Sequence, residues 1–111
     1  MLTIDKLRES GADVDSGLAR CMGMEAFYLS LVEKSLQDKN FEVLKESIAA
    51  KDYDTAFEAA HALKGVLGNL SLEPMYTKMC EITELLRART DMDYGPLLDD
   101  FFASKNVLDE A

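Results

Sequence analysis

The sequence predicts an all-α protein, folded as an antiparallel four-helix bundle with short additional N-terminal helices. Apolar residues recur at spacings of three and four over long stretches, which is typical of amphipathic helices. The 111 residues include only two prolines and six glycines, and no stretch alternates apolar and polar residues as a half-buried strand does. Because the long helices are separated by turns of a few residues, neighbouring helices should pack antiparallel.

Two short helices are expected before the bundle. The first covers residues 3–9 and ends at the dipeptide 10–11, where a glycine marks the C-terminus. The second is capped by Asp13 or Asp15, because either side chain can accept a hydrogen bond from an N–H group of the first turn.

The first helix of the bundle is predicted to run from Met24 to Ala50. The polar run 37–40 interrupts its apolar stripe. This run could mark a bend or a stretch that overhangs the bundle, and we favour one continuous helix. The apolar positions that define the helix are Phe27, Tyr28, Leu31, Val32, Leu36, Phe41, Leu44 and Ile48.

The next helix contains the only histidine of the chain. It should begin at Asp52 or Asp54 and end at Asn69 or Leu70. One apolar stripe runs along it and can face the core. The stripe consists of Ala56, Ala60, Leu63, Leu67 and Leu70.

Two further helices complete the bundle. Residues 71–74 form a turn and a helix start, because proline is favoured in the first turn of a helix. The last helix should be capped by Asp91 or Asp93, with Pro96 in its opening turn. The apolar positions of these two helices are Leu72, Met75, Met79, Ile82 and Leu86, then Tyr94, Leu97, Leu98, Phe101, Phe102 and Leu108.

The charge balance argues against two classes of partner. The chain has 21 Asp and Glu against 12 Lys and Arg, a formal net charge of −9. Binding of nucleic acid needs clustered basic residues that neutralise phosphates, and anionic membranes also attract basic surfaces. We therefore expect no nucleic-acid partner and no membrane partner, and we attribute the acidity chiefly to solubility.

The remaining composition indicates a cytoplasmic protein whose residues 1–111 form a single domain. No apolar run approaches the roughly 20 residues of a membrane-spanning helix, and residues 1–5 do not resemble a signal peptide. Cys21 and Cys80 lack the spacing of metal ligands, so free buried thiols are expected, and one histidine makes a zinc site improbable. We expect no bound metal or cofactor, and methionines that fill gaps in the core.

The candidate site is centred on His61. On a helix, Lys64, Gly65 and Gly68 share its face, at positions i+3, i+4 and i+7. His61 lies off the apolar stripe and should therefore point to solvent. Imidazole is a nucleophile near neutral pH, and the Lys64 cation can hold a phosphoryl group on the neighbouring ring.

The presence of two glycines within this helix requires an explanation, since a glycine in a helix interior destabilises the helix by about 1 kcal/mol relative to alanine. One explanation is clearance, because a side chain at Gly65 or Gly68 would obstruct a macromolecule that approaches the His61 ring. The alternative is close packing against a neighbouring helix, which requires the glycines to face that helix instead of solvent.

These residues resemble a known family. The string His61-Ala62-Leu63-Lys64-Gly65, followed by the segment 68–70, is similar to the signature of histidine-containing phosphotransfer (HPt) domains. The segment 14–21 also resembles a stretch near the N-terminus of that family. Val66, Leu67 and Ser71 depart from the family pattern, in which small residues and a closing glycine are common; we expect Leu67 to face the core.

The resemblance implies a phosphorelay protein. His61 would accept a phosphoryl group from the aspartate of a receiver domain and pass it to a second receiver, and Lys64 would stabilise the transferring charge. Mg²⁺ would be bound by the receiver and not by this chain, which would be a phosphoryl carrier without kinase activity. The implied partners are response-regulator receiver domains and a hybrid histidine kinase, and we expect a monomer. The direction of phosphoryl flow stays open.

Partner docking would involve Gly65 and Gly68 together with the exposed residues Glu58, Ala62 and Asn69. The alternative function is a helical adaptor that docks signalling domains through the same face and is never phosphorylated. Its weakness is that docking alone requires neither His61 nor Lys64. The chain could also be part of a larger hybrid or chemotaxis-type kinase.

Overall fold

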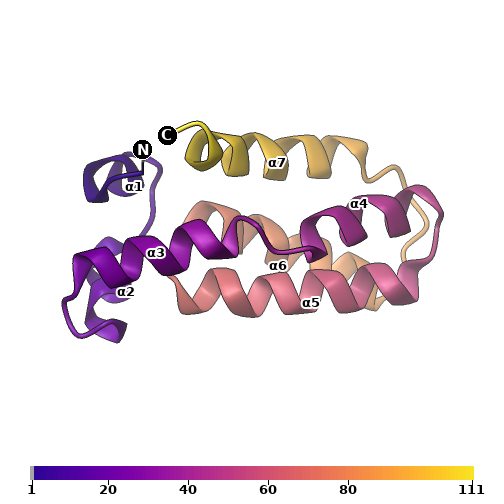
Figure 1. Cartoon of the computed structure of the whole chain (residues 1–111). Coiled ribbons are helices and arrows are strands. Elements are labelled where there is room, and N and C mark those ends of the chain that lie inside the picture. The colour runs from indigo at the N-terminus through magenta and orange to yellow at the C-terminus, as the bar shows by residue number, and fades with distance from the viewer. Residues whose placement is uncertain (1) are drawn as a thin grey trace.

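The computed structural model describes residues 2–111 and contains helices but no strand within them. Figure 1 shows their arrangement. The helices are α1 (Ile4–Glu9), α2 (Val14–Arg20), α3 (Glu25–Ser35), α4 (Asn40–Ala49), α5 (Tyr53–Asn69), α6 (Glu73–Arg87) and α7 (Gly95–Asp109). The predicted all-α fold is confirmed.

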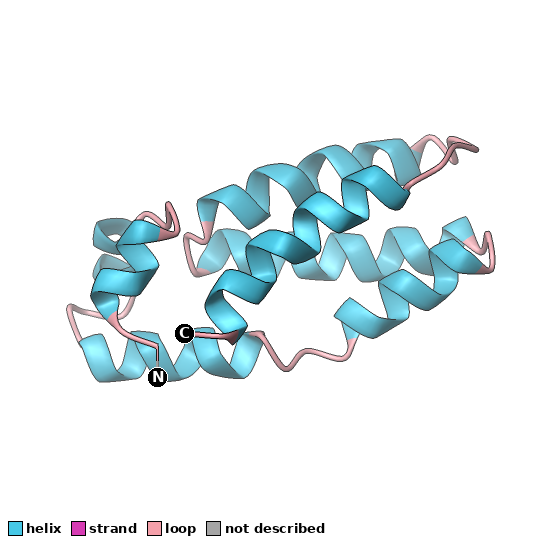
Figure 2. Ribbon diagram, turned by 90° about the horizontal axis from the view of Figure 1, so that it is seen from above, coloured by secondary structure: helices cyan, strands magenta, loops and turns pink. Residues whose placement is uncertain are grey.

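Helix α5 lies between α4 and α6, and α7 packs against α6. The bundle closes where α7 meets α4, because the rings of Phe41 and Phe101 stack with centroids 6.1 Å apart. In Figures 1 and 2, α3 and α4 follow one another along one side of the molecule, so that together they occupy one position of the bundle. The short helices α1 and α2 lie at the end of the bundle near the C-terminal end of α7.

The core contains every position of the predicted α5 stripe. Ala56, Ala60, Leu63 and Leu67 have no exposed surface, and Leu70 is 9% exposed. Leu67 faces inward, as expected from its place in the stripe.

The prediction of one continuous helix over residues 24–50 is wrong, because the chain breaks between α3 and α4. The Asp38 carboxylate accepts a hydrogen bond from the backbone N–H of Asn40 (2.8 Å), which replaces a helical bond. Leu36 and Phe41 are both buried, although they would be separated by about 140° around an unbroken helix. The break therefore turns both side chains towards the core.

The caps of α2 and α5 agree with the sequence prediction, whereas Thr3, expected within the first helix, is the N-cap of α1. Thr3, Asp13 and Asp52 accept hydrogen bonds at the N-termini of α1, α2 and α5. The cap of α7 differs, since the N-cap residue is Tyr94 and not Asp91 or Asp93.

The N-terminal segment covers the C-terminal end of α5. Arg20 Nη1 donates to the carbonyl oxygens of Gly68 (2.6 Å) and Asn69 (2.9 Å). The Tyr28 hydroxyl donates to the carbonyl of Leu70 (2.7 Å), and the N–H of Asp13 donates to the carbonyl of Ser71 (2.9 Å). Carbonyl groups at a helix C-terminus have no partner within the helix, so these donors satisfy them.

Two expectations for sulfur-containing residues need correction. Met75 and Met79 fill the core, but Met22, Met24 and Met92 are exposed. Both cysteines are free, Cys21 buried and Cys80 only half-buried. No helix within residues 2–111 combines the length and the hydrophobicity that crossing a membrane requires.

Candidate functional site

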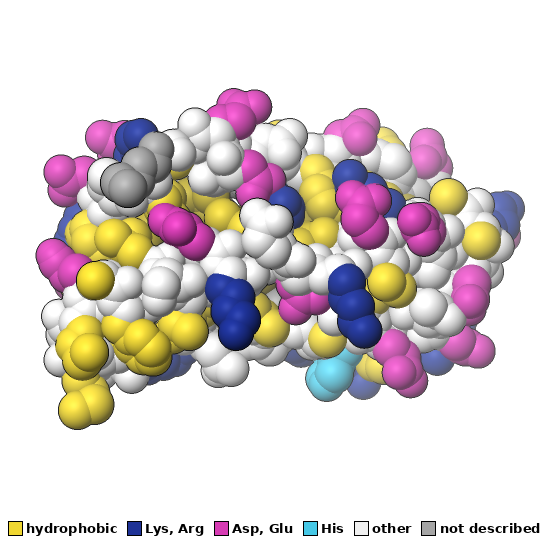
Figure 3. Space-filling model, viewed as in Figure 1, with side chains coloured by type: hydrophobic (Ala, Val, Ile, Leu, Met, Phe, Trp, Pro, Cys, Tyr) yellow, Lys and Arg dark blue, Asp and Glu magenta, His cyan; other side chains and the backbone are white. Residues whose placement is uncertain are grey.

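Helix α5 presents His61 to solvent. The helix begins after Asp52, whose carboxylate accepts hydrogen bonds from the hydroxyl (2.7 Å) and the backbone N–H (3.2 Å) of Thr55. These bonds stabilise the carboxylate and lower the pKa of Asp52. Because the apolar stripe is packed into the bundle, the opposite side of α5 is exposed, and His61 with it. Figure 3 shows the histidine at the lower edge of the molecule, beside basic side chains.

The two glycines of the site have different surroundings. A Cβ atom at Gly65 would meet no atom within 4 Å, so this position is open space next to His61. A Cβ at Gly68 would lie 2.9 Å from Cε1 of Tyr76 on α6. Gly65 therefore fits the clearance explanation, whereas Gly68 allows a neighbouring ring to pack against α5.

Lys64 lies one turn from His61, half-buried, and within residues 2–111 it forms no salt bridge. Together with Gly65 and Arg20 it lines an open hollow of about 350 Å³. The ammonium group is thus available to an anion held on the imidazole.

The predicted docking residues Glu58, Ala62 and Asn69 are all exposed. They lie on the same side of α5 as His61, as the helical period requires. Asn69 and Gly68 also line the hollow beside Lys64. The structure thus gathers every residue that the sequence assigned to the site on or beside one surface of α5.

The sequence reasoning did not include Phe57 in the site. Its ring stacks on the His61 imidazole, with centroids 5.8 Å apart and planes inclined by 24°. The guanidinium groups of Arg87, the last residue of α6, and of Arg89, in the turn that follows, lie over the Phe57 ring. The i, i+4 spacing of Phe57 and His61 was the signal that could have revealed the stack.

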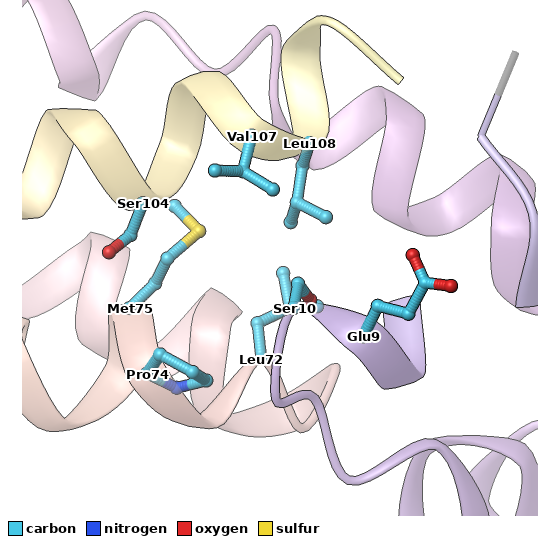
Figure 4. A pocket seen from close by; sticks show the side chains of 8 residues that line it. All are labelled: Glu9, Ser10, Leu72, Pro74, Met75, Ser104, Val107 and Leu108. Carbon is cyan, nitrogen blue, oxygen red and sulfur yellow. The ribbon is translucent and has the colours of Figure 1, made fainter. Parts of the chain in front are cut away.

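A further hollow lies away from this surface. It has a volume of about 240 Å³ and is lined by residues of α1, α6 and α7, among them Glu9, Met75 and Val107. Figure 4 shows that these side chains converge between the end of α7, the start of α6 and α1. No α5 residue lines it, so it does not belong to the His61 site. Within residues 2–111, no group of three or more His, Cys, Asp or Glu side chains could hold a metal ion.

Comparison with known proteins identifies the family of the chain. No curated protein and no solved structure matches the chain. A family model described as the Hpt domain matches residues 28–111. These residues include most of α3, the break between α3 and α4, and all of helices α4–α7. The match does not reach the segment 14–21, so that part of the resemblance stays a prediction. Because the matched residues are most of the chain and contain the exposed His61 of α5, the chain belongs to the Hpt domain family.

Proposed function

We propose that this protein accepts a phosphoryl group on His61 from the aspartate of a receiver domain and passes it to the aspartate of another receiver. Hpt domains are phosphocarrier modules of phosphorelays, so membership of the family gives the chain a role in phosphotransfer. The identity of the donor and acceptor as receiver aspartates is the part that we propose.

One observation carries the proposal. His61 is exposed on α5, and the neighbouring position on the same face, Gly65, is open to solvent. A macromolecule can therefore bring a reacting group to the imidazole without meeting a side chain there. A histidine that served only the packing of the core would instead be buried.

The chemistry follows from the groups at this surface. A ring nitrogen of His61, expected to be Nε2, attacks the phosphorus of the receiver's aspartyl phosphate. A P–N bond forms, the P–O bond to the aspartate breaks, and the carboxylate leaves with the bond electrons. Lys64 neutralises charge on the transferring group, which is the main contribution that proteins make to phosphoryl transfer. Mg²⁺ would be bound by the receiver. The second transfer reverses these bond changes on another receiver.

The same proposal includes the setting of the reaction. The partners are response-regulator receivers and a hybrid histidine kinase that feeds the first receiver. The protein acts as a monomer in the cytoplasm, and it contributes no kinase activity of its own.

The test is transfer of labelled phosphate from phosphorylated receiver domains to the wild-type protein and to His61→Gln. Several receivers are tried, and the folds of both proteins are compared by circular dichroism. We expect label on the wild type alone. The label should be lost in acid and retained in base, as for phosphohistidine, while an acyl phosphate is lost in base.

Two results would contradict the proposal. Label on His61→Gln would place the phosphoryl group on another residue. Absence of label from every donor, with both proteins folded, would favour the adaptor that docks signalling domains without being phosphorylated.

A further inference from the structure

The ring of Phe57 packs directly on the His61 imidazole. Phe57 precedes His61 by four residues on α5, and the two rings stack with a centroid distance of 5.8 Å. Residues at this spacing are neighbours on a helix surface. An aromatic ring in this position restricts the rotation of the imidazole about its side-chain bonds, because most other rotamers would lose the stacked contact.

The phenyl ring is itself held in place by two arginines. The guanidinium carbons of Arg87 and Arg89 lie 5.0 and 5.3 Å from the centroid of the Phe57 ring. These are cation–π distances. Both arginines belong to the end of α6 and the turn that follows it, so the contacts tie the His61 face of α5 to the neighbouring helix.

The arginines are anchored in turn. Arg89 Nε donates to Asp54 Oδ1 (2.6 Å), and Arg89 Nη1 donates to the carbonyl of Leu86 (2.7 Å). Arg87 Nε donates to the Glu84 carboxylate (3.3 Å). A connected set of contacts therefore runs from Asp54 through Arg89 and Phe57 to His61.

The bundle core accounts for only part of the contacts of this aromatic side chain. The core positions of the same part of α5 are Ala56 and Ala60, which are fully buried. Phe57 is only half-buried, at the edge of the core. Its exposed part contacts the imidazole of His61 and the two guanidinium groups.

We propose that Phe57 is a positioning residue for phosphoryl transfer, which fixes the orientation of the His61 imidazole while Arg87 and Arg89 hold the phenyl ring. This inference rests on the proposed function of His61. Reaction rates depend steeply on the alignment of the attacking atom, so loss of the stack should slow the transfer step. Binding of the receiver should change little, because the open surface at Gly65 is unaffected.

The experiment compares the wild type with Phe57→Leu, Phe57→Tyr and the control Phe27→Leu. Leucine keeps an apolar side chain without a ring, and tyrosine keeps the ring. Phe27 is a phenylalanine of α3 with 48% of its surface exposed, and it lies outside the proposed site.

The first measurement is the NMR spectrum of the imidazole C–H groups, which is unambiguous because His61 is the only histidine. A stacked phenyl ring shifts these signals. We expect Phe57→Leu to abolish the shift, and Phe57→Tyr and Phe27→Leu to keep it.

The second measurement is transfer from a phosphorylated receiver that labels the wild type, at varied receiver concentration. We expect Phe57→Leu to lower the maximal transfer rate about tenfold, with a half-saturating receiver concentration within roughly twofold of the wild-type value. Phe57→Tyr should recover most of the rate, and Phe27→Leu should match the wild type.

The outcomes separate this inference from the function on which it rests. Equal rates for Phe57→Leu and the wild type, or equally slow rates for Phe57→Tyr and Phe57→Leu, would overturn the role of Phe57 alone. A wild-type protein that no receiver labels would overturn the proposed function and this role together.

Discussion

The ring of Tyr76 on α6 lies against the backbone of Gly68 on α5, so close that a Cβ atom at residue 68 would stand 2.9 Å from Cε1 of the ring. Gly65, one turn earlier on the same helix, has no such neighbour. The two glycines of the His61 face are therefore explained differently. Gly68 makes room for the packed Tyr76 ring, whereas Gly65 leaves open space beside His61.

This difference predicts opposite effects of alanine at the two positions. Gly65→Ala should stabilise the protein by about 0.5–1 kcal/mol, because alanine favours the helix and meets no obstruction. Gly68→Ala gains the same helix preference but forces the Tyr76 ring to move, and such overpacking costs about 1–3 kcal/mol. Urea unfolding of both variants beside the wild type measures the free energies of unfolding.

The double variant Gly68→Ala with Tyr76→Ala is the control, since it removes the obstructing ring. Alanine at residue 68 should be tolerated better in that background than in the wild type. If Gly68→Ala is as stable as Gly65→Ala, the packing explanation of Gly68 is wrong.

The features that the sequence predicts well are those that depend on the helical period. The α5 stripe, the exposure of His61 and the start of α5 after Asp52 follow from spacing and from a capping side chain, both of which are local. The distinction between Gly65 and Gly68 is not local, because it depends on which residue of α6 lies opposite each glycine.

Tertiary contacts also explain why the prediction of one continuous helix over residues 24–50 is wrong. The break between α3 and α4 places Leu36 and Phe41 in one core, a demand that no window of sequence contains. The stack of Phe57 on His61 is indicated by their i, i+4 spacing, but that spacing does not reveal the arginines that hold the phenyl ring, which come from the end of α6 and the turn after it.

A large acidic side chain at Gly65 tests the clearance explanation. Gly65→Glu should fold, because the position is open, but should lower the rate of transfer from a receiver at least about tenfold by obstructing its approach to His61. The rate is measured with the donor used for the wild type. Gly65→Ala is the matched control, and its transfer rate should fall much less than that of Gly65→Glu.

The reactivity of the imidazole in Gly65→Glu is checked with diethyl pyrocarbonate, a small reagent that modifies histidine. Modification of His61 at the wild-type rate would show that the ring is still accessible, so that any lost transfer reflects docking. Transfer from the receiver at the wild-type rate would instead contradict the clearance explanation.

The contact of Arg20 with the end of α5 should contribute to stability. Its guanidinium donates to the carbonyl oxygens of Gly68 and Asn69, and a cation at a helix C-terminus is favourable. We expect Arg20→Ala to lower the free energy of unfolding by about 1 kcal/mol. The control is Arg8→Ala, which breaks an exposed ion pair with Asp15 (3.0 Å) and should cost at most about 0.5 kcal/mol. Equal losses in the two variants would show that Arg20 has no special part in holding the end of α5.

Tyr28 provides a second link to the end of α5, and this link depends on pH. Its hydroxyl is buried and donates to the carbonyl of Leu70 (2.7 Å). Tyr28→Phe leaves that acceptor without its partner, so we expect the free energy of unfolding at pH 7 to fall by about 1–2 kcal/mol. Thermal or urea unfolding measures the loss.

Burial raises the pKa of the Tyr28 hydroxyl above its usual value, with smaller contributions from Cys21 and Asp13. The folded protein therefore holds this proton more tightly than the unfolded chain does. The resulting stability is fully present below about pH 10, where a tyrosine of the unfolded chain begins to ionise, and is lost as the pH rises through the higher pKa of the folded state.

The difference in stability between wild type and Tyr28→Phe should thus be constant near neutral pH and shrink above about pH 10. The other tyrosines, whose pKa values are also raised, are present in both proteins and cancel in this difference. A difference that stays constant up to pH 11 would mean that the Tyr28 hydroxyl is not held as the hydrogen bond to Leu70 requires.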